Sequence, residues 1–153
     1  GGMAADAYHL TGTHPEGEGA VLGMEEAMRE AGISAKDIDH INMHATSTPV
    51  GDHSELVAIQ RVFGVAPNLN ISATKSMTGH LLGAAGAIEA IACIMSTIDN
   101  QIPPTINTAH VDEEWDGKFD MTLGKAKKRT VRYAMSNTFG FGGHNGIVVF
   151  KKV

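Results

Sequence analysis

Cysteine is almost missing from this chain of 153 residues, which contains only Cys93. A single cysteine excludes an internal disulfide framework and any zinc site of the Cys-x-x-Cys type. It fits a reducing compartment, and we therefore expect a cytoplasmic protein. Basic runs are also scarce, since none is longer than Lys127–Arg129 and the net charge is −5. This charge distribution argues against nucleic acid as a partner, because phosphate binding needs clustered Lys and Arg.

Targeting and membrane signals are equally sparse. No basic segment followed by an apolar stretch opens the sequence, so we expect no signal peptide. The most apolar stretch, Leu81 to Ile98, is short for a membrane span, carries Glu89 near its middle and has no basic flanks. We therefore expect no membrane association. A stretch that is apolar or small at nearly every position instead predicts a fully buried central helix.

Hydrophobic residues make up 42% of the chain and charged residues 19%, which suits one folded domain. Apolar spacing predicts a helix from Gly19 to Ala31, and Asp52 and Glu55 have the spacing of a capping box for a second helix ending near Phe63. Short strands are predicted at 38–43, 69–72, 131–135 and 146–150, whereas 110–128 reads as a surface loop. Alternating helices and strands with a closing strand pair predict a layered α/β fold.

Three polar loops follow predicted strands, at 44–51, 72–86 and 136–146. Because ligands bind beyond the carboxyl ends of strands in α/β sheets, these loops are expected to form one pocket. They would bring together His44, Lys75 and His80. Two imidazoles facing one pocket can polarise a carbonyl or transfer protons. Zinc binding by histidines is the competing use, but their spacing matches no short zinc signature.

Glu89 lies within the apolar helix, and burying its carboxylate requires compensation. Hydrogen bonds from loop amides are one solution. The other is a hard cation shared with oxygens of Asn42, Ser136 and Asn137, and the sequence leaves both open. Cys93 lies in the same apolar helix, where burial would raise the pKa of its thiol, so we do not expect it to be a nucleophile.

Four segments together resemble the C-terminal half of the elongating, thiolase-fold β-ketoacyl-acyl-carrier-protein synthases. The resemblance extends over nearly the whole chain and is carried by Asp6–His9, Asn42–Asp52, Thr74–Gly86 and Ser136–Asn145. It implies a layered thiolase-like half with a mixed sheet flanked by helices. It also implies that residues 1–153 form the C-terminal domain of a longer enzyme whose N-terminal half is absent here.

The resemblance implies a catalytic role for three residues. His44 and His80 correspond to the two histidines of the family's Cys-His-His triad, which donate hydrogen bonds to the thioester carbonyl during malonyl decarboxylation and condensation. Lys75 corresponds to the lysine that orients and tunes the second histidine. The nucleophilic cysteine belongs to the N-terminal half, so the isolated chain is expected to be inactive.

Further positions correspond to the family's substrate and cation sites. Thr46 and Thr48 match the pair that binds the phosphopantetheine arm, and Phe139 and Phe141 match aromatics beside the active site, the latter on a gating loop. A structural monovalent cation is implied by four positions, which are Asn42, Glu89, Ser136 and Asn137. The resemblance implies no other cofactor, since the phosphopantetheine is carried by the partner protein.

Two residues depart from the family's usual pattern, because Ala45 replaces Gly and His144 replaces Thr. Neither change removes a catalytic group, and the second could alter the hydrogen bonds of the gating loop. The implied activity is decarboxylative condensation in fatty-acid elongation, with acyl carrier protein, the N-terminal half and a second copy of the enzyme as partners. A polyketide ketosynthase piece, or a non-catalytic carrier-binding or chain-length half-protein, is the alternative.

Overall fold

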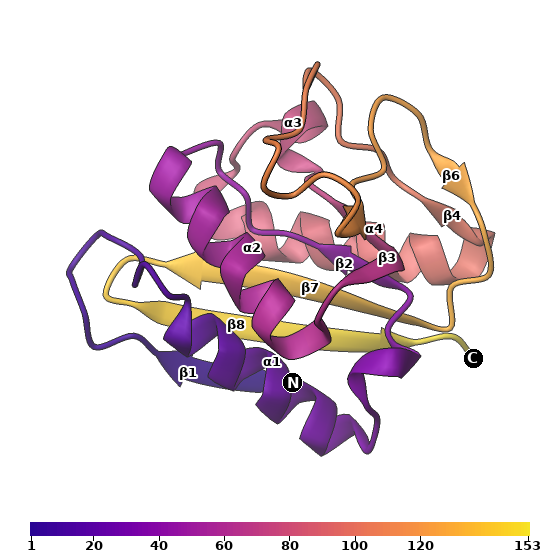
Figure 1. Cartoon of the computed structure of the whole chain (residues 1–153). Helices are drawn as coiled ribbons and strands as arrows, with labels where there is room; N and C mark the ends of the chain where they lie inside the picture. The colour runs from indigo at the N-terminus through magenta and orange to yellow at the C-terminus, as the bar shows by residue number, and fades with distance from the viewer.

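The computed structural model describes all 153 residues as a sheet between two helical layers (Figure 1). The elements occur in the order β1 (Gly2–Ala5), α1 (Glu18–Ala31), η1 (Ala35–Asp37), β2 (His40–Asn42), α2 (Pro49–Phe63), β3 (Ala66–Ser72), α3 (Lys75–Thr78), η2 (Leu82–Ala84), α4 (Ala85–Asp99), β4 (Gln101–Ile102), β5 (Phe119–Asp120), β6 (Lys127–Lys128), β7 (Tyr133–Gly140) and β8 (His144–Lys151). The elements η1 and η2 are short 3₁₀ helices.

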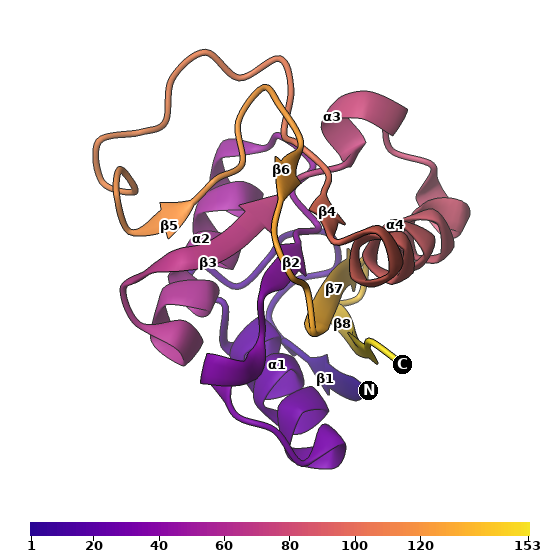
Figure 2. The same cartoon turned by 90° about the vertical axis from the view of Figure 1, so that its right-hand side faces the viewer.

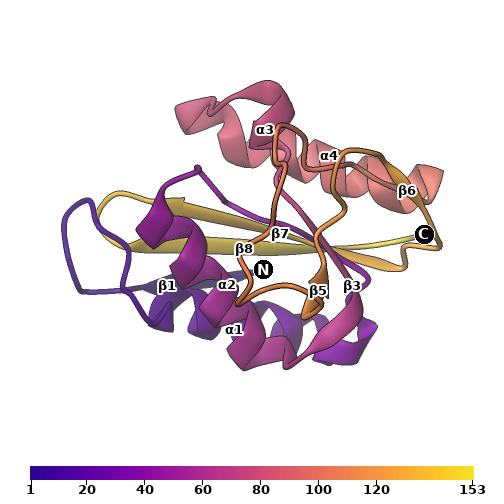
Figure 3. The ribbon, with the colours of Figure 1, turned by 45° about the horizontal axis from the view of Figure 1, so that its top comes forward.

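The main sheet has six strands in the order β1-β8-β7-β2-β3-β5. Strands β7, β2, β3 and β5 are parallel to one another, whereas β8 is antiparallel to both of its neighbours. Helices α1 and α2 cover one face, and α4 covers the other (Figure 3). The predicted layered α/β fold with a mixed sheet is thus confirmed. A separate two-stranded ribbon pairs β4 with β6.

Helix α1 forms as its apolar spacing predicts. Its buried face includes Met24 and Ala27, and it ends at Gly32, whose φ of 67° places it in the left-handed conformation that glycine adopts without strain. The main core lies between this helix, α2 and the sheet, where Ile41, Ile59 and Met135 have no solvent exposure. Burial of these aliphatic side chains holds the first layer to the sheet.

Helix α2 begins three residues earlier than the capping-box spacing predicted. Thr48 is its N-cap and Pro49 is its first residue, a position that suits proline because its missing N–H has no helical partner. Asp52 and Glu55 therefore lie within the helix and do not form the predicted capping box. Their carboxylates point instead at the loop that precedes the helix.

Two loop predictions also require correction. Most of residues 136–145 belongs to β7 and β8, because the hairpin continues in register from Tyr133–Lys151 to Gly140–His144. The segment 110–128 is not all surface, since Trp115 and Phe119 are buried in the main core. In both segments the polar and glycine residues suggested loops, whereas long-range pairing and core contacts determine the structure.

The prediction that the helix from Leu81 to Ile98 is fully buried is wrong. Helix α4 buries Glu89, Cys93 and Ser96 against the sheet, while Ile91 is 54% exposed and Ile98 60% exposed. Figure 2, viewed along this helix, shows its outer side free of other elements. The physical reason is that α4 is the only long helix on its side of the sheet, so nothing in this chain covers its outer face.

The segment Leu82–Asp99 is long and apolar enough to pass a length-and-composition test for a membrane span, with 28% of it buried. Core helices of soluble proteins pass the same test, so the result does not by itself indicate a membrane span. Its sheet-facing residues include a charged glutamate and a serine.

Candidate active site

A cavity of about 700 Å³ lies at the carboxyl ends of β2, β3 and β7. Residues from all three predicted loops line it, which confirms that these loops converge. The segment between β1 and α1 supplies a further wall that the pocket prediction did not include, with Asp6 and Thr11–Thr13. The parallel pairing of the three strands produces this convergence, because it places their carboxyl ends at one edge of the sheet.

His44 and His80 face each other in this cavity. Their ring centroids are 5.7 Å apart with the planes perpendicular, and the Phe139 ring lies 5.3 Å from that of His44. Burial, together with the smaller effects of the charges of Lys75 and His80, lowers the pKa of His44 to about 3. His44 is therefore a neutral imidazole at physiological pH.

The hydrogen bonding of His80 fixes its tautomer. The backbone N–H of Leu82 donates to Nδ1 of His80 over 3.1 Å, so Nδ1 is the acceptor nitrogen. In the neutral ring the proton then resides on Nε2, which can donate a hydrogen bond. Nδ1 of His44 is buried and makes no hydrogen bond within the chain. The pair can therefore present neutral N–H donors to an oxygen on which negative charge develops.

Glu55, which sequence reasoning did not place in the site, fixes the backbone at His44. Its two carboxylate oxygens accept the backbone N–H groups of His44 and Ala45, each over 2.9 Å, and one of them also accepts the side-chain amide of Asn137 over 3.0 Å. The backbone at Ala45 has a φ of 24°, which is strained for a residue other than glycine. The glutamate therefore holds the loop in the conformation that aims His44 into the cavity.

A signal for Glu55 was present in the sequence. Glu55, Ala58 and Ile59 occupy one face of α2, so an acidic residue stands at a core-facing position, as Glu89 does in α4. The capping-box interpretation obscured it. Asp52 supports the same loop from the next turn, by accepting the backbone N–H of Ser47 over 3.1 Å.

Replacing Glu55 with glutamine is expected to change the pH dependence of stability and the order of the loop that carries His44. Burial raises the pKa of Glu55 to about 7, against the lowering effect of its three N–H donors. The folded protein then keeps this proton up to about pH 7, whereas the unfolded chain releases it near pH 4.5. The free energy of unfolding should fall by roughly 3 kcal/mol as the pH rises through this window, and Glu55→Gln should remove that slope.

The same variant should also loosen the loop of His44, because a glutamine NH₂ group cannot accept an N–H from that loop. Urea unfolding between pH 4 and 8 measures the slope, and hydrogen exchange of the His44 and Ala45 amides measures the loop. Glu25→Gln, on the exposed face of α1, serves as the control. An unchanged pH slope in Glu55→Gln would show that another group titrates in this range.

Lys75 and Glu89 form a buried ion pair behind the histidines. Nζ of Lys75 donates to Oε1 of Glu89, and the two side chains are 5% and 1% exposed. Lys75 thus compensates the buried carboxylate of Glu89, in a way that differs from the two predicted ones, hydrogen bonds from loop amides and a bound cation. Burial raises the pKa of Glu89, while Lys75 opposes that rise. The lysine charge also acts on His44, whose pKa it lowers.

The four residues of the predicted cation site do not all share one face of the sheet. Asn42 and Ser136 are register partners on adjacent strands, both beside Cys93 on the α4 side. Oε2 of Glu89 and Oγ of Ser136 are buried oxygens without hydrogen-bond partners, whereas the amide of Asn42 donates to Thr74. The side chain of Asn137 contacts Glu55 on the opposite face, so it could offer that site only a backbone oxygen.

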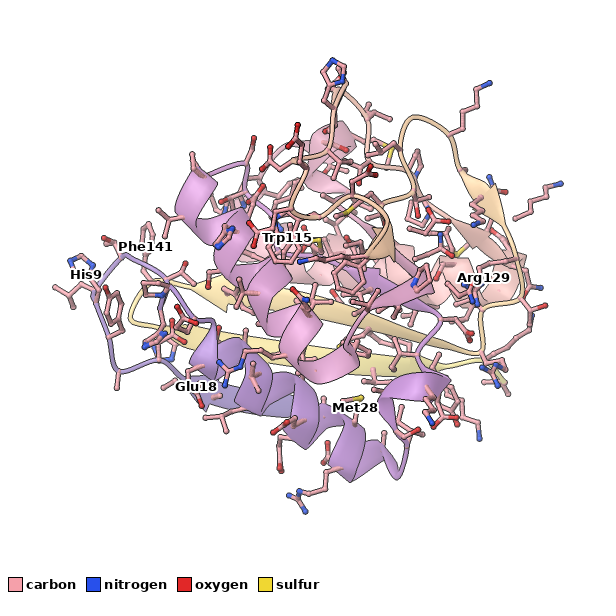
Figure 4. All side chains as sticks on the ribbon, in the orientation of Figure 1. His9, Glu18, Met28, Trp115, Arg129 and Phe141 are labelled. Atoms are coloured by element: carbon pink, nitrogen blue, oxygen red, sulfur yellow. The ribbon has the colours of Figure 1, made fainter.

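The predicted substrate-binding residues also line the cavity. The hydroxyl oxygens of Thr46 and Thr48 are 3.3 Å apart at its wall, and Phe139 lies beside His44. Phe141 is 78% exposed at the hairpin turn, and Figure 4 shows it at the same end of the molecule as His9, opposite Arg129. His144 follows that turn and lines the cavity as well.

The turn that carries Phe141 is tied to the segment before α1. Asp6 donates its backbone N–H to the carbonyl of Gly143 over 2.8 Å and accepts the amide of Asn145 over 2.8 Å. The backbone N–H of Gly142 donates to Leu10 over 2.7 Å. Gly142 and Gly143 have φ values of 86° and 76°, which glycine adopts without strain. These contacts form one wall of the cavity.

Cys93 is buried as predicted. It has no solvent exposure, and burial raises the pKa of its thiol to about 12, so it is not a thiolate at physiological pH. No group of three His, Cys, Asp or Glu side chains is placed to hold a metal ion.

Residues 1–109, more than two thirds of the chain, match the family model described as Beta-ketoacyl synthase, C-terminal domain. The chain therefore belongs to the β-ketoacyl synthases. This confirms the family suggested by the four motifs. The family match covers both histidines and Lys75 but ends before β7 and β8, which carry Phe139 and Phe141.

Relatives of this β-ketoacyl synthase extend the match to its whole length. It is 51% identical over 152 residues to 3-oxoacyl-[acyl-carrier-protein] synthase 2 of Staphylococcus aureus (strain COL), covering 99% of this chain and 36% of the relative. It is similar to the ishigamide ketosynthase/chain length factor, with a TM-score of 0.91 and 35% identity over 99% of this chain and 36% of that one. The chain thus spans about a third of the length of the relatives it matches.

The chain is also similar to the solved AntDE:AntF complex, a type II PKS acyl-carrier protein in complex with its ketosynthase bound to the hexaketide. It aligns with a TM-score of 0.91 and 32% identity, over 99% of this chain and 38% of that one. These neighbours are ketosynthases of the thiolase fold, which confirms the predicted thiolase-like half.

Proposed function

We propose that this β-ketoacyl synthase domain supplies the two histidines of a 3-oxoacyl-acyl-carrier-protein synthase in fatty-acid elongation. The observation that carries the proposal is the facing pair His44 and His80 in a cavity with the Thr46 and Thr48 hydroxyls at its wall. The 51% identity to a 3-oxoacyl-[acyl-carrier-protein] synthase 2 supports elongation over polyketide synthesis, since the identity to the type II PKS ketosynthase complex is only 32%.

In this reaction an acyl group is held as a thioester on a cysteine of the N-terminal half. Malonyl thioester loses CO₂, and the electron pair of the broken carbon–carbon bond forms an enolate whose oxygen accepts hydrogen bonds from the neutral imidazoles. The enolate carbon then attacks the acyl carbonyl, and the cysteine thiolate leaves. This chain provides the oxygen-binding donors but no nucleophile, because its only thiol is buried and protonated.

The remaining site residues have supporting roles in the proposal. Thr46 and Thr48 bind the amide-bearing phosphopantetheine arm of acyl carrier protein, which is delivered past Phe141 to a reaction centre beside Phe139. Lys75 acts as a fixed positive charge near the histidines and is held by Glu89. It therefore orients and tunes the imidazoles and does not attack substrate.

The reaction needs no resident cofactor besides the arm carried by the partner. The unpartnered oxygens of Glu89 and Ser136 are hard donors on one face of the sheet and fit a monovalent cation, together with backbone oxygens near Asn42 and Asn137. Such a cation would offset the buried carboxylate in addition to Lys75. It would have a structural role and take no part in the reaction.

Three partners belong to the proposal, namely acyl carrier protein, the N-terminal half of the enzyme and a second copy of the complete chain. The solved ketosynthases that resemble this domain include complexes with an acyl-carrier protein and with chain length factors. The exposed apolar face of α4, including Ile91, Met95 and Ile98, is the surface that the N-terminal half would cover. We place the complete enzyme in the cytoplasm, without a nucleic-acid or membrane partner.

The 153-residue chain purified alone is expected to show no malonyl-dependent condensation and to self-associate through α4. It lacks an accessible thiol, and its exposed apolar residues favour association. Multi-angle light scattering and a condensation assay with acyl and malonyl carrier proteins measure both properties. Ile91→Lys with Ile98→Lys should reduce the association, whereas Leu22→Lys on exposed α1 should not. A monomer that condenses acyl groups would contradict the proposal.

The second candidate is a non-catalytic half that works with a partner, as the name of the ishigamide ketosynthase/chain length factor suggests for that protein. The intact His44, His80 and Lys75 favour the catalytic assignment, since a non-catalytic half would not require the facing histidines. Full-length protein that binds acyl carrier protein but does not release CO₂ from malonyl carrier protein would support the second candidate.

A further inference from the structure

Thr48 does not use its hydroxyl as an N-cap threonine ordinarily does. It is the N-cap residue of α2, where a threonine side chain usually accepts the backbone N–H of the second or third helical residue. Thr48 makes no such bond. Its Oγ1 lies 3.3 Å from Oγ1 of Thr46, and both residues line the cavity. The hydroxyl is thus turned away from the role that its position in the helix favours.

Gly51, the third residue of α2, leaves the space that this orientation needs. A Cβ atom on Gly51 would lie 2.5 Å from Oγ1 of Thr48, which is closer than such atoms approach in real structures. The backbone of Gly51 is helical and does not have a positive φ, so its conformation does not require glycine. Alanine would suit this helical position better than glycine by its intrinsic propensity. Glycine at position 51 therefore leaves room for the Thr48 hydroxyl.

We infer that Gly51 is a positioning residue that keeps the Thr48 hydroxyl facing the cavity, and that it thereby sets the affinity for the amide-bearing arm of the substrate. This inference rests on the proposed function, in which Thr46 and Thr48 bind that arm. A side chain at position 51 forces Thr48 to rotate about its Cα–Cβ bond. The hydroxyl then leaves Thr46 and moves toward the backbone N–H groups of the first helical turn, where an N-cap threonine normally bonds.

The test uses the full-length enzyme with three variants, Gly51→Ala, Thr48→Ala and the double variant. Decarboxylation of malonyl carrier protein gives KM and kcat for each. Gly51→Ala should raise KM about five- to tenfold, as expected for one lost hydrogen bond, and leave kcat within about twofold. Thr48→Ala should do the same. The double variant should have the same KM as Thr48→Ala, because a Cβ at position 51 has no hydroxyl to displace once Thr48 is alanine.

A malonyl thioester that lacks the pantetheine arm provides the matched substrate control. Gly51→Ala should process it as the wild type does, since the arm is what the Thr48 hydroxyl contacts. The thermal midpoint of Gly51→Ala should equal or exceed that of the wild type, because alanine favours the helix. These two readouts distinguish lost substrate contact from structural damage.

An unchanged KM in Gly51→Ala would overturn the inference, and so would an effect that adds fully to that of Thr48→Ala. Failure of Gly51→Ala to fold would overturn the inference too. It would show that the added Cβ displaces the backbone and does not rotate the Thr48 side chain. A wild-type enzyme without malonyl decarboxylation would refute the proposed function itself. That result is distinguishable because it does not depend on any variant.

Discussion

His80→Ala in the full-length enzyme is expected to slow decarboxylation of malonyl carrier protein by roughly two to three orders of magnitude. Nδ1 of His80 accepts the backbone N–H of Leu82, so Nε2 is the nitrogen that can donate a hydrogen bond into the cavity. This donor stabilises the enolate oxygen that appears when CO₂ leaves. Loss of one such preorganised donor typically lowers the rate about 100- to 1,000-fold. Release of CO₂ from radiolabelled malonyl carrier protein measures the effect.

Two further variants make the His80 result specific. His80→Gln retains a neutral N–H donor on the side chain and should recover part of the activity lost in His80→Ala. His53→Ala removes an imidazole outside the cavity, where His53 contacts Trp115 and Glu114, and should decarboxylate at the wild-type rate. Retained decarboxylation in His80→Ala would show that this imidazole does not stabilise the enolate.

Lys75→Met is expected to destabilise the protein by about 3–5 kcal/mol, the usual cost of leaving one member of a buried ion pair without its partner. Lys75 and Glu89 are both almost completely buried, so solvent cannot compensate the remaining carboxylate. The loss should be smaller near pH 5 than at pH 8, because the unpaired Glu89 can take up a proton at low pH. Urea unfolding of the full-length protein at both pH values measures the difference.

The double variant Lys75→Met/Glu89→Leu separates charge from packing. Replacing both members of a buried pair by apolar side chains is often neutral, so this variant should recover most of the lost stability. It should remain poorly active, since the charge beside the histidines is gone. A loss below about 1 kcal/mol in Lys75→Met would mean that another positive charge compensates Glu89. A monovalent cation bound at Glu89 and Ser136 would be the candidate to measure next.

The histidine pair was predictable because its signals are local. His44 follows a strand, Lys75 and His80 lie between a strand and a helix, and parallel strands bring such loops to one edge. Helix α1 was predictable for the same kind of reason, since its apolar spacing and terminal glycine lie within fifteen residues. The family motifs are also continuous segments, which a sequence displays directly.

The predictions that were wrong concern residues whose structure depends on contacts with distant parts of the chain. Polar residues in β7 indicated a loop, yet Ser136 and Asn137 are strand residues because β2 and β8 pair with them. Glu55 suggested a cap, yet its partners are the backbone at His44 and the side chain of Asn137. No local pattern identifies a partner eighty residues away, so these assignments required the fold.

The family, the three long helices, strands β2, β3, β7 and β8, and the loops that converge on the cavity could be inferred from continuous segments of the sequence. The fold was needed to show that Lys75 compensates Glu89, that Glu55 supports the loop of His44, and that the outer face of α4 is uncovered. Burial and charge compensation each need two contacting surfaces. A sequence pattern shows which side of one helix or strand is apolar, but it does not show which surface packs against that side.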